Sequence, residues 1–216
     1  MKNVLIAVDV QNDFCPGGSL AVEDGELIIP QINRLVNCDR FDFIIATQDW
    51  HTENHISFAS THKCSPFETV QVDYGDQRLW PDHCVQGSAG AQFHSLFDDK
   101  KVQFIIRKGF RKNIDSYSAF FENDKVTSTG LNALIGGLVG EGDFRLVIAG
   151  IATDVCVYYT AIDARSKLHY HNVVVAIDAC AGISKQGVDE AVKKMEFSGI
   201  QCKSTEAVIT DMVGRK

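Results

Sequence analysis

The stretch Phe144-Arg145-Leu146-Val147-Ile148-Ala149 runs directly into Gly150-Ile151-Ala152-Thr153-Asp154-Val155-Cys156-Val157. The first six residues form a short apolar run that predicts a buried strand, and the following residues 158–168 have helical apolar spacing. Cys156 is therefore expected where a strand passes into a helix. Thr153 is the expected N-cap of that helix, which places Cys156 in the first turn. Free backbone N–H groups and the helix dipole favour a thiolate there.

Strands and helices alternate along the rest of the chain. Apolar runs predict further strands at 2–8, 41–47, 102–106, 172–177 and 207–210, and helical spacing or capping predicts further helices at 25–36, 130–139 and 184–197. This alternation predicts an α/β fold, a three-layer sandwich whose mainly parallel sheet of about six strands has helices on both faces. Residues 52–101 show no periodic element, and a loop of that length in a compact domain is usually functional.

Composition limits the protein's class and partners. A chain of 216 residues with 45% hydrophobic residues predicts one domain spanning residues 1–216. The net charge of -7 comes without a long basic run, so we expect a small-molecule substrate, with neither nucleic acid nor membrane as the main partner. The apolar run near the N-terminus is too short for a signal segment or a membrane span, which predicts a cytoplasmic protein. Seven scattered cysteines without a C-x-x-C pair predict mostly free thiols.

Titratable residues stand at the ends of four predicted strands. Asp9 ends the first strand, Asp49 and His51 follow the second, Lys108 follows the third, and Cys156 lies one turn beyond the fourth. In parallel α/β sheets the ligand crevice lies at the carboxyl ends of the strands. These side chains are therefore expected to converge on one edge of the sheet.

Asp9, Lys108 and Cys156 together predict a nucleophilic site. A cysteine nucleophile needs a group that removes its proton, and no histidine occupies a strand end beside Cys156; Asp9 can serve instead. The Lys108 ammonium would stabilise the thiolate and hold the carboxylate in place. The alternative is that Cys156 is a buried structural cysteine.

A second set of residues predicts a metal site. Asp49 and His51 are two residues apart, so in an extended chain both side chains leave the same face, and His83 offers a third ligand. One carboxylate and two imidazoles leave coordination positions open and suit one divalent ion, for which zinc, iron(II) and manganese all qualify. The aromatic residues Phe14 and Trp80 are candidates to sandwich a flat ring, or to belong to the core.

Six motifs link these residues to a known family. They are Asp9-Val10-Gln11-Asn12-Asp13-Phe14 with Gly17-Gly18, Asp49-Trp50-His51 with Asn54-His55-Ile56-Ser57-Phe58, Trp80-Pro81-Asp82-His83-Cys84-Val85-Gln86-Gly87, Arg107-Lys108-Gly109, Asp115-Ser116-Tyr117-Ser118-Ala119-Phe120 and Gly150-Ile151-Ala152-Thr153-Asp154-Val155-Cys156-Val157. Over nearly its whole length the chain resembles the isochorismatase-like cysteine hydrolases. The D-W-H and W-P-x-H segments resemble those of members that convert nicotinamide to nicotinic acid and ammonia in NAD salvage.

The resemblance implies a role for each candidate residue. Cys156 is implied to attack the amide carbonyl and form a thioester, with Asp9 as general base and proton donor and Lys108 supporting both. A cis peptide bond before Ala152 is implied, so that the backbone N–H groups of Ala152 and Cys156 form an oxyanion hole. A metal ion, zinc by first expectation, is implied on Asp49, His51 and His83, where it anchors the pyridine nitrogen while Phe14 and Trp80 flank the ring.

Several alternatives stay open on the sequence alone. The substrate could be another small amide or a carbamoyl compound, and the sequence does not decide whether pyrazinamide-like analogues are accepted. Two alternatives belong to other functional classes. One is a non-heme iron(II) protein that uses Asp49, His51 and His83 for redox chemistry, and the other is a binding protein without catalysis. The sequence also leaves open a fourth metal ligand, for which His55 and Ser57 are candidates, and whether the chain forms a homo-oligomer.

Overall fold

A six-stranded parallel sheet forms the centre of the protein, for which a computed structural model describes residues 1–213. The strand order is β5-β2-β1-β6-β7-β8, and every neighbouring pair is parallel. The strands are β1 (Lys2–Val8), β2 (Phe43–Asp49), β5 (Phe104–Lys108), β6 (Phe144–Ile151), β7 (Asn172–Ala181) and β8 (Gln201–Lys203). The α/β fold class predicted from the sequence is confirmed.

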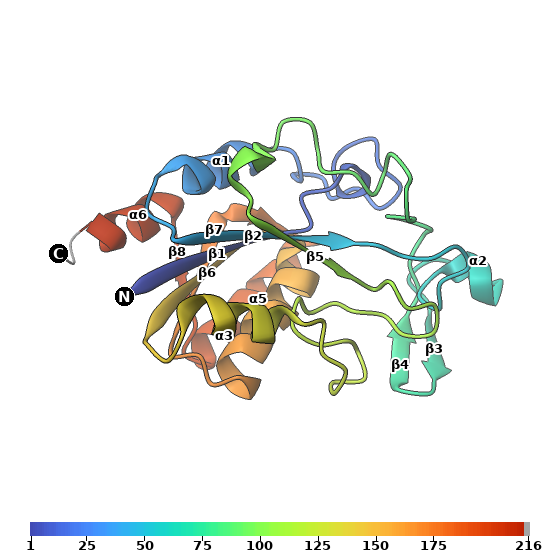
Figure 1. Ribbon diagram of the computed structural model, residues 1–216. Helices are drawn as coiled ribbons and strands as arrows, with labels where there is room; N and C mark the ends of the chain where they lie inside the picture. The colour runs from blue at the N-terminus through green and yellow to red at the C-terminus, as the bar shows by residue number, and fades with distance from the viewer. Residues whose placement is uncertain (214–216) are drawn as a thin grey trace.

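Helices cover both faces of this sheet (Figure 1). One face carries α1 (Ile29–Asn37) and α6 (Thr205–Val213), and the other carries α3 (Leu131–Val139), α4 (Tyr158–Ile162) and α5 (Lys185–Phe197). Wider helical turns precede and follow α4, at Thr153–Val157 and Asp163–Lys167. Each face of the sheet contributes to a separate apolar core. None of the helices within residues 1–213 is long and apolar enough to cross a membrane.

The two central strands bring the candidate site together. β1 and β6 pair in register from Lys2 opposite Phe144 to Val8 opposite Gly150, and most of their side chains are buried on both faces. Gly150 has a φ of +131°, and a Cβ atom there would lie 2.1 Å from the carbonyl oxygen of Val8. Only glycine allows this close approach. It brings the end of β1, and Asp9 behind it, directly beside the chain that leads to Cys156.

The C-terminal segment corrects one prediction. Residues 207–210 were expected to form the last strand but lie within the helix α6, while the last strand is β8, a few residues earlier. The Ser204 hydroxyl accepts a hydrogen bond from the Ala207 N–H at 3.3 Å, and its carbonyl accepts from Val208 at 3.0 Å. These bonds cap and start a helix, and a short apolar run alone cannot distinguish helix from strand.

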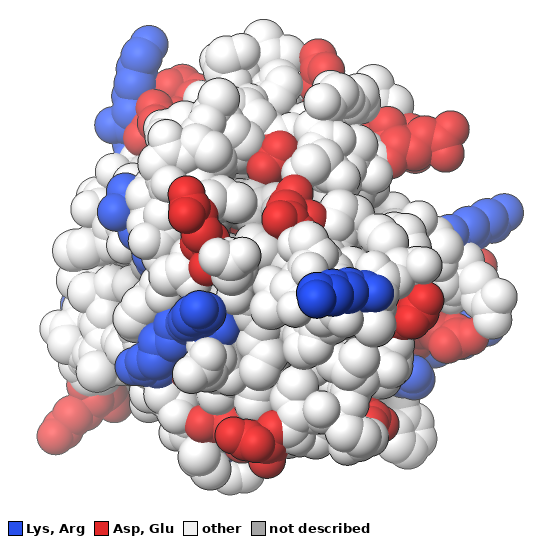
Figure 2. All heavy atoms as spheres, turned by 90° about the vertical axis from the view of Figure 1, so that its right-hand side faces the viewer, with Lys and Arg blue, Asp and Glu red and all other residues white. Residues whose placement is uncertain are grey.

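The long segment at 52–101, expected to be irregular, contains short elements, and the helix and the hairpin among them lie beyond the carboxyl ends of the strands (Figure 1). They are the helix α2 (Ala59–His62), the antiparallel hairpin of β3 (Thr69–Val72) and β4 (Gly75–Arg78), and a 3-10 turn at Asp99–Lys101. All seven cysteines are free thiols, as expected. On the face at these strand ends, acidic and basic side chains are interspersed (Figure 2).

Candidate active site and metal centre

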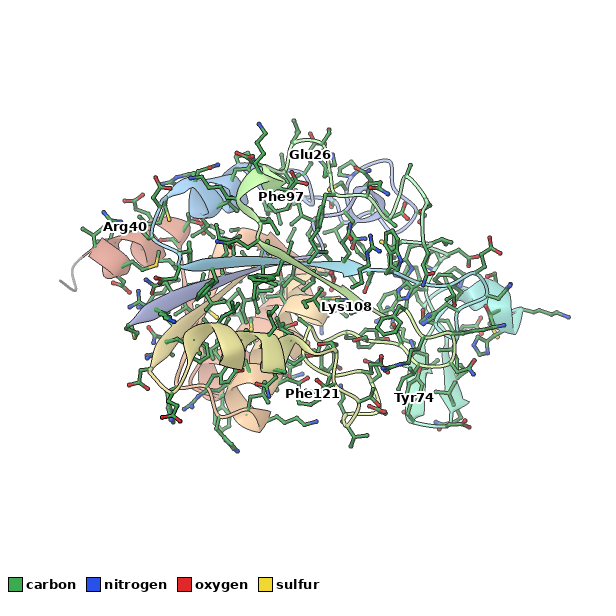
Figure 3. All side chains as sticks on the ribbon, in the orientation of Figure 1. Glu26, Arg40, Tyr74, Phe97, Lys108 and Phe121 are labelled. Carbon is green, nitrogen blue, oxygen red and sulfur yellow. The ribbon has the colours of Figure 1, made fainter. Side chains whose placement is uncertain are left out.

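Asp9, Lys108 and Cys156 come together although they follow three different strands. Asp9 follows β1, Lys108 is the last residue of β5, and Cys156 lies in the turn after β6. The Lys108 Nζ lies 2.9 Å from an Asp9 carboxylate oxygen and 3.5 Å from the Cys156 Sγ. Figure 3 labels Lys108 at the strand end from which its side chain reaches these groups. The Asp9 and Lys108 side chains are completely buried, and Cys156 is 7% exposed.

The Lys108 ammonium is held by several acceptors at once. It pairs with the carboxylates of Asp9 and Asp49 and donates to the Ser116 carbonyl at 3.0 Å. Burial opposes the charge, but the carboxylates of Asp49 and Asp9 outweigh it and hold the pKa of Lys108 well above its ordinary value. The lysine is therefore a permanent cation between the two carboxylates.

Asp9 has a special backbone and a supporting hydroxyl. Its φ of +49° belongs to the left-handed region, which aspartate tolerates better than most residues. Thr47 Oγ1 donates to the Asp9 carboxylate at 2.6 Å and accepts from the Asp9 N–H at 3.2 Å. Burial raises the pKa of Asp9, Lys108 lowers it, and Asp49 raises it again, so the net pKa lies above the ordinary value. A carboxylate with this pKa is a better proton acceptor than an exposed aspartate.

The local structure around Cys156 differs from the prediction in two respects. The helical turn begins at Thr153, so its N-cap position is Ala152 and no side chain caps it. Cys156 nevertheless lies in the first turn, as expected. Burial raises the pKa of the Cys156 thiol well above its ordinary value; Lys108 lowers it, but Asp9 and Asp49 raise it further. Burial, together with the two carboxylates that oppose the effect of the ammonium, thus favours the thiol form of Cys156 over the thiolate.

The three expected metal ligands also converge. Asp49 ends β2 and His51 follows two residues later, while His83 comes from the segment whose Cys84 carbonyl accepts from the His51 N–H at 3.0 Å. Gln11, which the sequence did not single out, fixes Asp49: its side-chain amide donates to the Asp49 carbonyl at 2.9 Å and accepts from the Asp49 N–H at 2.8 Å.

The donor set of Asp49, His51 and His83 fits a divalent metal ion. His51 Nδ1 donates to the Gly109 carbonyl at 2.9 Å and His83 Nδ1 to the Pro81 carbonyl at 2.7 Å, which leaves both Nε2 atoms as ligands. Those Nε2 atoms lie 3.7 and 3.8 Å from the same Asp49 oxygen, too far for a hydrogen bond, and one ligand atom from each of the three residues lies within 4.8 Å of the others. Zinc, iron(II) and manganese all accept such ligands.

His55 and Ser57, the candidates for a further ligand, are engaged elsewhere. The His55 Nε2 donates to the carbonyls of Arg111 and Ile114 at 3.0 and 3.1 Å, and its Nδ1 accepts from the Ser57 hydroxyl at 2.7 Å. Burial lowers the pKa of His55 to about 4, which keeps the ring neutral. Both ring nitrogens thus have partners of their own.

One pocket joins the nucleophile to the metal set. Its lining includes Phe14, Asp49, His51, Trp80, His83, Ala152 and Cys156. The sequence did not assign pocket roles to six further lining residues, Leu20, Val22, Asp115, Tyr117, Val155 and Ile183. Tyr117 and Asp115 belong to a motif already noted, but their segment shows no periodicity from which their orientation follows. The peptide bond between Ile151 and Ala152 is cis, as the resemblance implied.

A comparison with known proteins identifies relatives along nearly the whole chain. A family model described as the isochorismatase domain matches residues 3–210. The nicotinamidase of Acinetobacter baylyi is 52% identical over 207 residues, which cover 95% of this chain and 94% of the relative.

Solved structures agree with this match. The nicotinamidase and pyrazinamidase of Acinetobacter baumanii superposes with a TM-score of 0.89 at 44% identity, covering 96% of this chain and 98% of that structure. The pyrazinamidase of Pyrococcus horikoshii, solved in complex with zinc, superposes with a TM-score of 0.75 at 32% identity, covering 94% and 99%.

Proposed function

The chain belongs to the isochorismatase family, and on this premise we propose that it is an amidohydrolase that converts nicotinamide to nicotinic acid and ammonia, a step of NAD salvage. The observation that carries the proposal is the pocket itself. It places the Cys156 thiol within reach of a molecule whose other end lies at the Asp49, His51 and His83 set. Nicotinamide has this form, with a carboxamide on one side of the ring and a nitrogen on the other.

Asp9 and Cys156 carry the first half of the reaction. The Cys156 sulfur attacks the carboxamide carbon as Asp9 accepts the thiol proton, and a C–S bond forms. Asp9 then gives that proton to the amide nitrogen, the C–N bond breaks and ammonia leaves. A thioester between the nicotinoyl group and Cys156 remains. Because burial raises the pKa of Asp9, it can both accept and return the proton.

Water completes the reaction through the same residues. Asp9 removes a proton from the attacking water, the C–S bond breaks, and nicotinic acid is released while the sulfur regains its proton. Lys108 keeps its charge throughout and holds Asp9 2.9 Å from its ammonium. The backbone N–H groups of Ala152 and Cys156 are the proposed donors to the developing carbonyl oxyanion.

The metal set positions the substrate in this proposal. Asp49, His51 and His83 would hold one divalent ion, with zinc first because the Pyrococcus horikoshii relative was solved with zinc. When bound, the ion supplies a Lewis-acid anchor for the pyridine nitrogen. Phe14 and Trp80 are 7% and 4% exposed and both line the pocket, where they would contact the ring faces. Fixing the ring in this way sets the distance between carboxamide and thiol.

A comparison of substrates tests the proposal. Ammonia and carboxylic acid release should be measured with nicotinamide, with benzamide, which lacks the ring nitrogen, and with an aliphatic amide. We expect kcat/KM for nicotinamide to exceed that for benzamide by at least about 100-fold. This factor is the expected effect of the bond between the ring nitrogen and the metal ion, which benzamide cannot form. Equal values for the three amides would favour a general small-amide hydrolase. A pyrazinamide-like amide keeps a ring nitrogen and is expected to be accepted.

The remaining alternative functions have distinct signatures. A non-heme iron(II) protein would show oxygen-dependent turnover that survives Cys156→Ala. A binding protein would take up nicotinamide without releasing ammonia. The family match favours hydrolysis over both.

We further propose that residues 1–216 form a single domain, of which 214–216 lie outside the described residues. The six-stranded sheet takes strands from both ends of the described chain, from β1 to β8, and the family model matches residues 3–210. The free cysteines suit a reducing compartment and support a cytoplasmic location. Homo-oligomer formation stays a prediction.

A further inference from the structure

A buried glutamine on the hairpin lies behind the substrate pocket. Gln77 belongs to β4, where both of its strand neighbours are exposed but its own side chain is completely buried. It points away from solvent and toward the irregular segment at 115–123. Buried polar side chains are retained where their hydrogen bonds are satisfied, and those of the Gln77 side chain reach five other residues.

The Gln77 amide uses both of its ends. Its Nε2 donates to an Asp115 carboxylate oxygen at 3.0 Å and to the Tyr117 hydroxyl at 3.1 Å, besides the neighbouring Arg78 carbonyl at 2.5 Å. Its Oε1 accepts from the Tyr74 hydroxyl at 2.8 Å and from Asn123 at 3.4 Å. Figure 3 labels Tyr74 on the hairpin, between β3 and β4.

The residues that Gln77 holds form one wall of the pocket. Asp115 and Tyr117 both line it, as does Trp80. The Tyr117 oxygen accepts a second hydrogen bond, from the Trp80 indole N–H at 3.2 Å, and the two rings meet edge to face with centroids 6.2 Å apart. Gln77 thus reaches Trp80 through a single shared oxygen.

We propose that Gln77 is a positioning residue that fixes the Trp80 and Tyr117 rings as the wall against which the substrate ring packs. This inference rests on the proposed function, because it assigns that wall to the pyridine ring of nicotinamide. Gln77 touches neither Cys156 nor Asp9, so it acts on the placement of the ring and not on the chemistry of the thiol.

An amide suits this position better than a carboxylate or a thioether of similar length. Glutamate in its place would lose both N–H donors and put a carboxylate beside Asp115. Methionine would keep the length but remove the acceptor of the Tyr74 O–H and the Nε2 donor to the Asp115 carboxylate, and the loss of such buried hydrogen bonds is costly. Both substitutions should therefore let the wall shift.

The test compares Gln77→Met and Gln77→Glu with Gln71→Met, a matched control because Gln71 is an exposed glutamine on the same hairpin. We expect the KM for nicotinamide to rise about tenfold in the Gln77 variants, the effect of losing roughly one hydrogen bond to the wall, with kcat within about threefold. The control should match the wild type. The milder Tyr74→Phe, which removes one donor to Gln77, should raise KM by about two- to threefold and gives a readout if a Gln77 variant does not fold.

A second readout separates positioning from general damage. Iodoacetamide should inactivate Cys156 at the same rate in the wild type and in the variants, while the concentration of nicotinic acid that half-protects Cys156 rises about as much as KM. If KM and the half-protecting concentration stay unchanged in the Gln77 variants, the inference is overturned. It is also overturned if kcat and the alkylation rate fall by the same factor by which KM rises, since that result would indicate general damage to the site. If the wild type releases no ammonia from nicotinamide, the proposed function fails, yet the protection assay still decides whether Gln77 positions the ring wall.

Discussion

The Lys108 ammonium lies 3.5 Å from the Cys156 sulfur, and both groups are buried. Such a cation would be expected to create a resting thiolate, but Asp9 and Asp49 flank the same ammonium and neutralise its effect. The thiol pKa is raised, with burial as the largest cause. In the proposed mechanism the cysteine is therefore activated during attack, by transfer of its proton to Asp9, and does not wait as a free thiolate.

Removal of the Lys108 charge should damage both folding and catalysis. In Lys108→Met the buried carboxylates of Asp9 and Asp49 lose their common partner, so we expect the free energy of unfolding to fall by about 3–5 kcal/mol. Activity should fall by at least about 100-fold. Urea unfolding and ammonia release measure the two effects. Lys101→Met, which removes an exposed ion pair with Asp39, is the control and should change neither. A stable and active Lys108→Met would contradict the assigned role.

The acid limb of the pH profile should reflect Asp9. Burial raises its pKa above the ordinary value of 3.8, and the hydrogen bond from Thr47 lowers it. Below its pKa Asp9 is protonated and cannot accept the thiol proton, so kcat/KM should fall as the pH drops through a value above the ordinary aspartate range. Thr47→Val removes the lowering hydrogen bond and should move this limb to higher pH. Thr69→Val, at an exposed position of the hairpin, is the control and should leave the acid limb in place. If the limb moves to lower pH in Thr47→Val, its assignment to Asp9 is refuted.

Metal binding should raise the melting temperature of the protein, which can be measured independently of activity. A ligand that binds only the folded state raises the melting temperature, and a ligand at 100 times its Kd adds about 2.7 kcal/mol. We expect zinc to raise the Tm of chelator-treated protein and His83→Ala to abolish that rise. His171→Ala, at an exposed histidine, should keep it. Equal zinc responses in His83→Ala and the wild type would place the ion elsewhere.

Gly109 should be required for the orientation of His51. Gly109 has a φ of +62°, and a Cβ atom there would lie 2.5 Å from His51 Cε1. The carbonyl of the same glycine accepts the hydrogen bond from His51 Nδ1. Gly87 also has a positive φ, +79°, but open space around it. Both Gly→Ala variants should lose about 1 kcal/mol of stability through backbone conformation. Only Gly109→Ala should lower zinc affinity, by about tenfold or more. Equal zinc affinities for the two variants would show that the clash is relieved without moving the ring.

The sequence predicted those parts of the fold that rest on simple patterns. The runs at 2–8 and 144–149 are apolar at nearly every position because β1 and β6 are buried on both faces, and Ser184 caps α5 as expected, accepting from Gly187 at 3.1 Å. The prediction of a strand at 207–210 was wrong because these four residues fit a helix as well as a strand, and only the Ser204 cap favours the helix. Patterns of this length carry too little information to decide.

The candidate site was predictable where residues stand at strand ends. Parallel topology brings such residues to one edge, and the structure places Asp9, Lys108 and Cys156 within reach of one another there. The hairpin and the wall behind the pocket were not predictable. Gln77 is buried where alternation would suggest an apolar residue, and its partners lie about 40 residues away in a segment without periodicity. Only the folded chain brings them together.

Trapping of the acyl-enzyme tests the central claim most directly. Wild-type protein turning over nicotinamide should be quenched in acid and its intact mass and peptides measured. We predict a nicotinoyl adduct on the peptide that contains Cys156, absent from Cys156→Ala, which should also release no ammonia above background. Full turnover without any adduct, together with near wild-type ammonia release by Cys156→Ala, would contradict covalent catalysis by this cysteine.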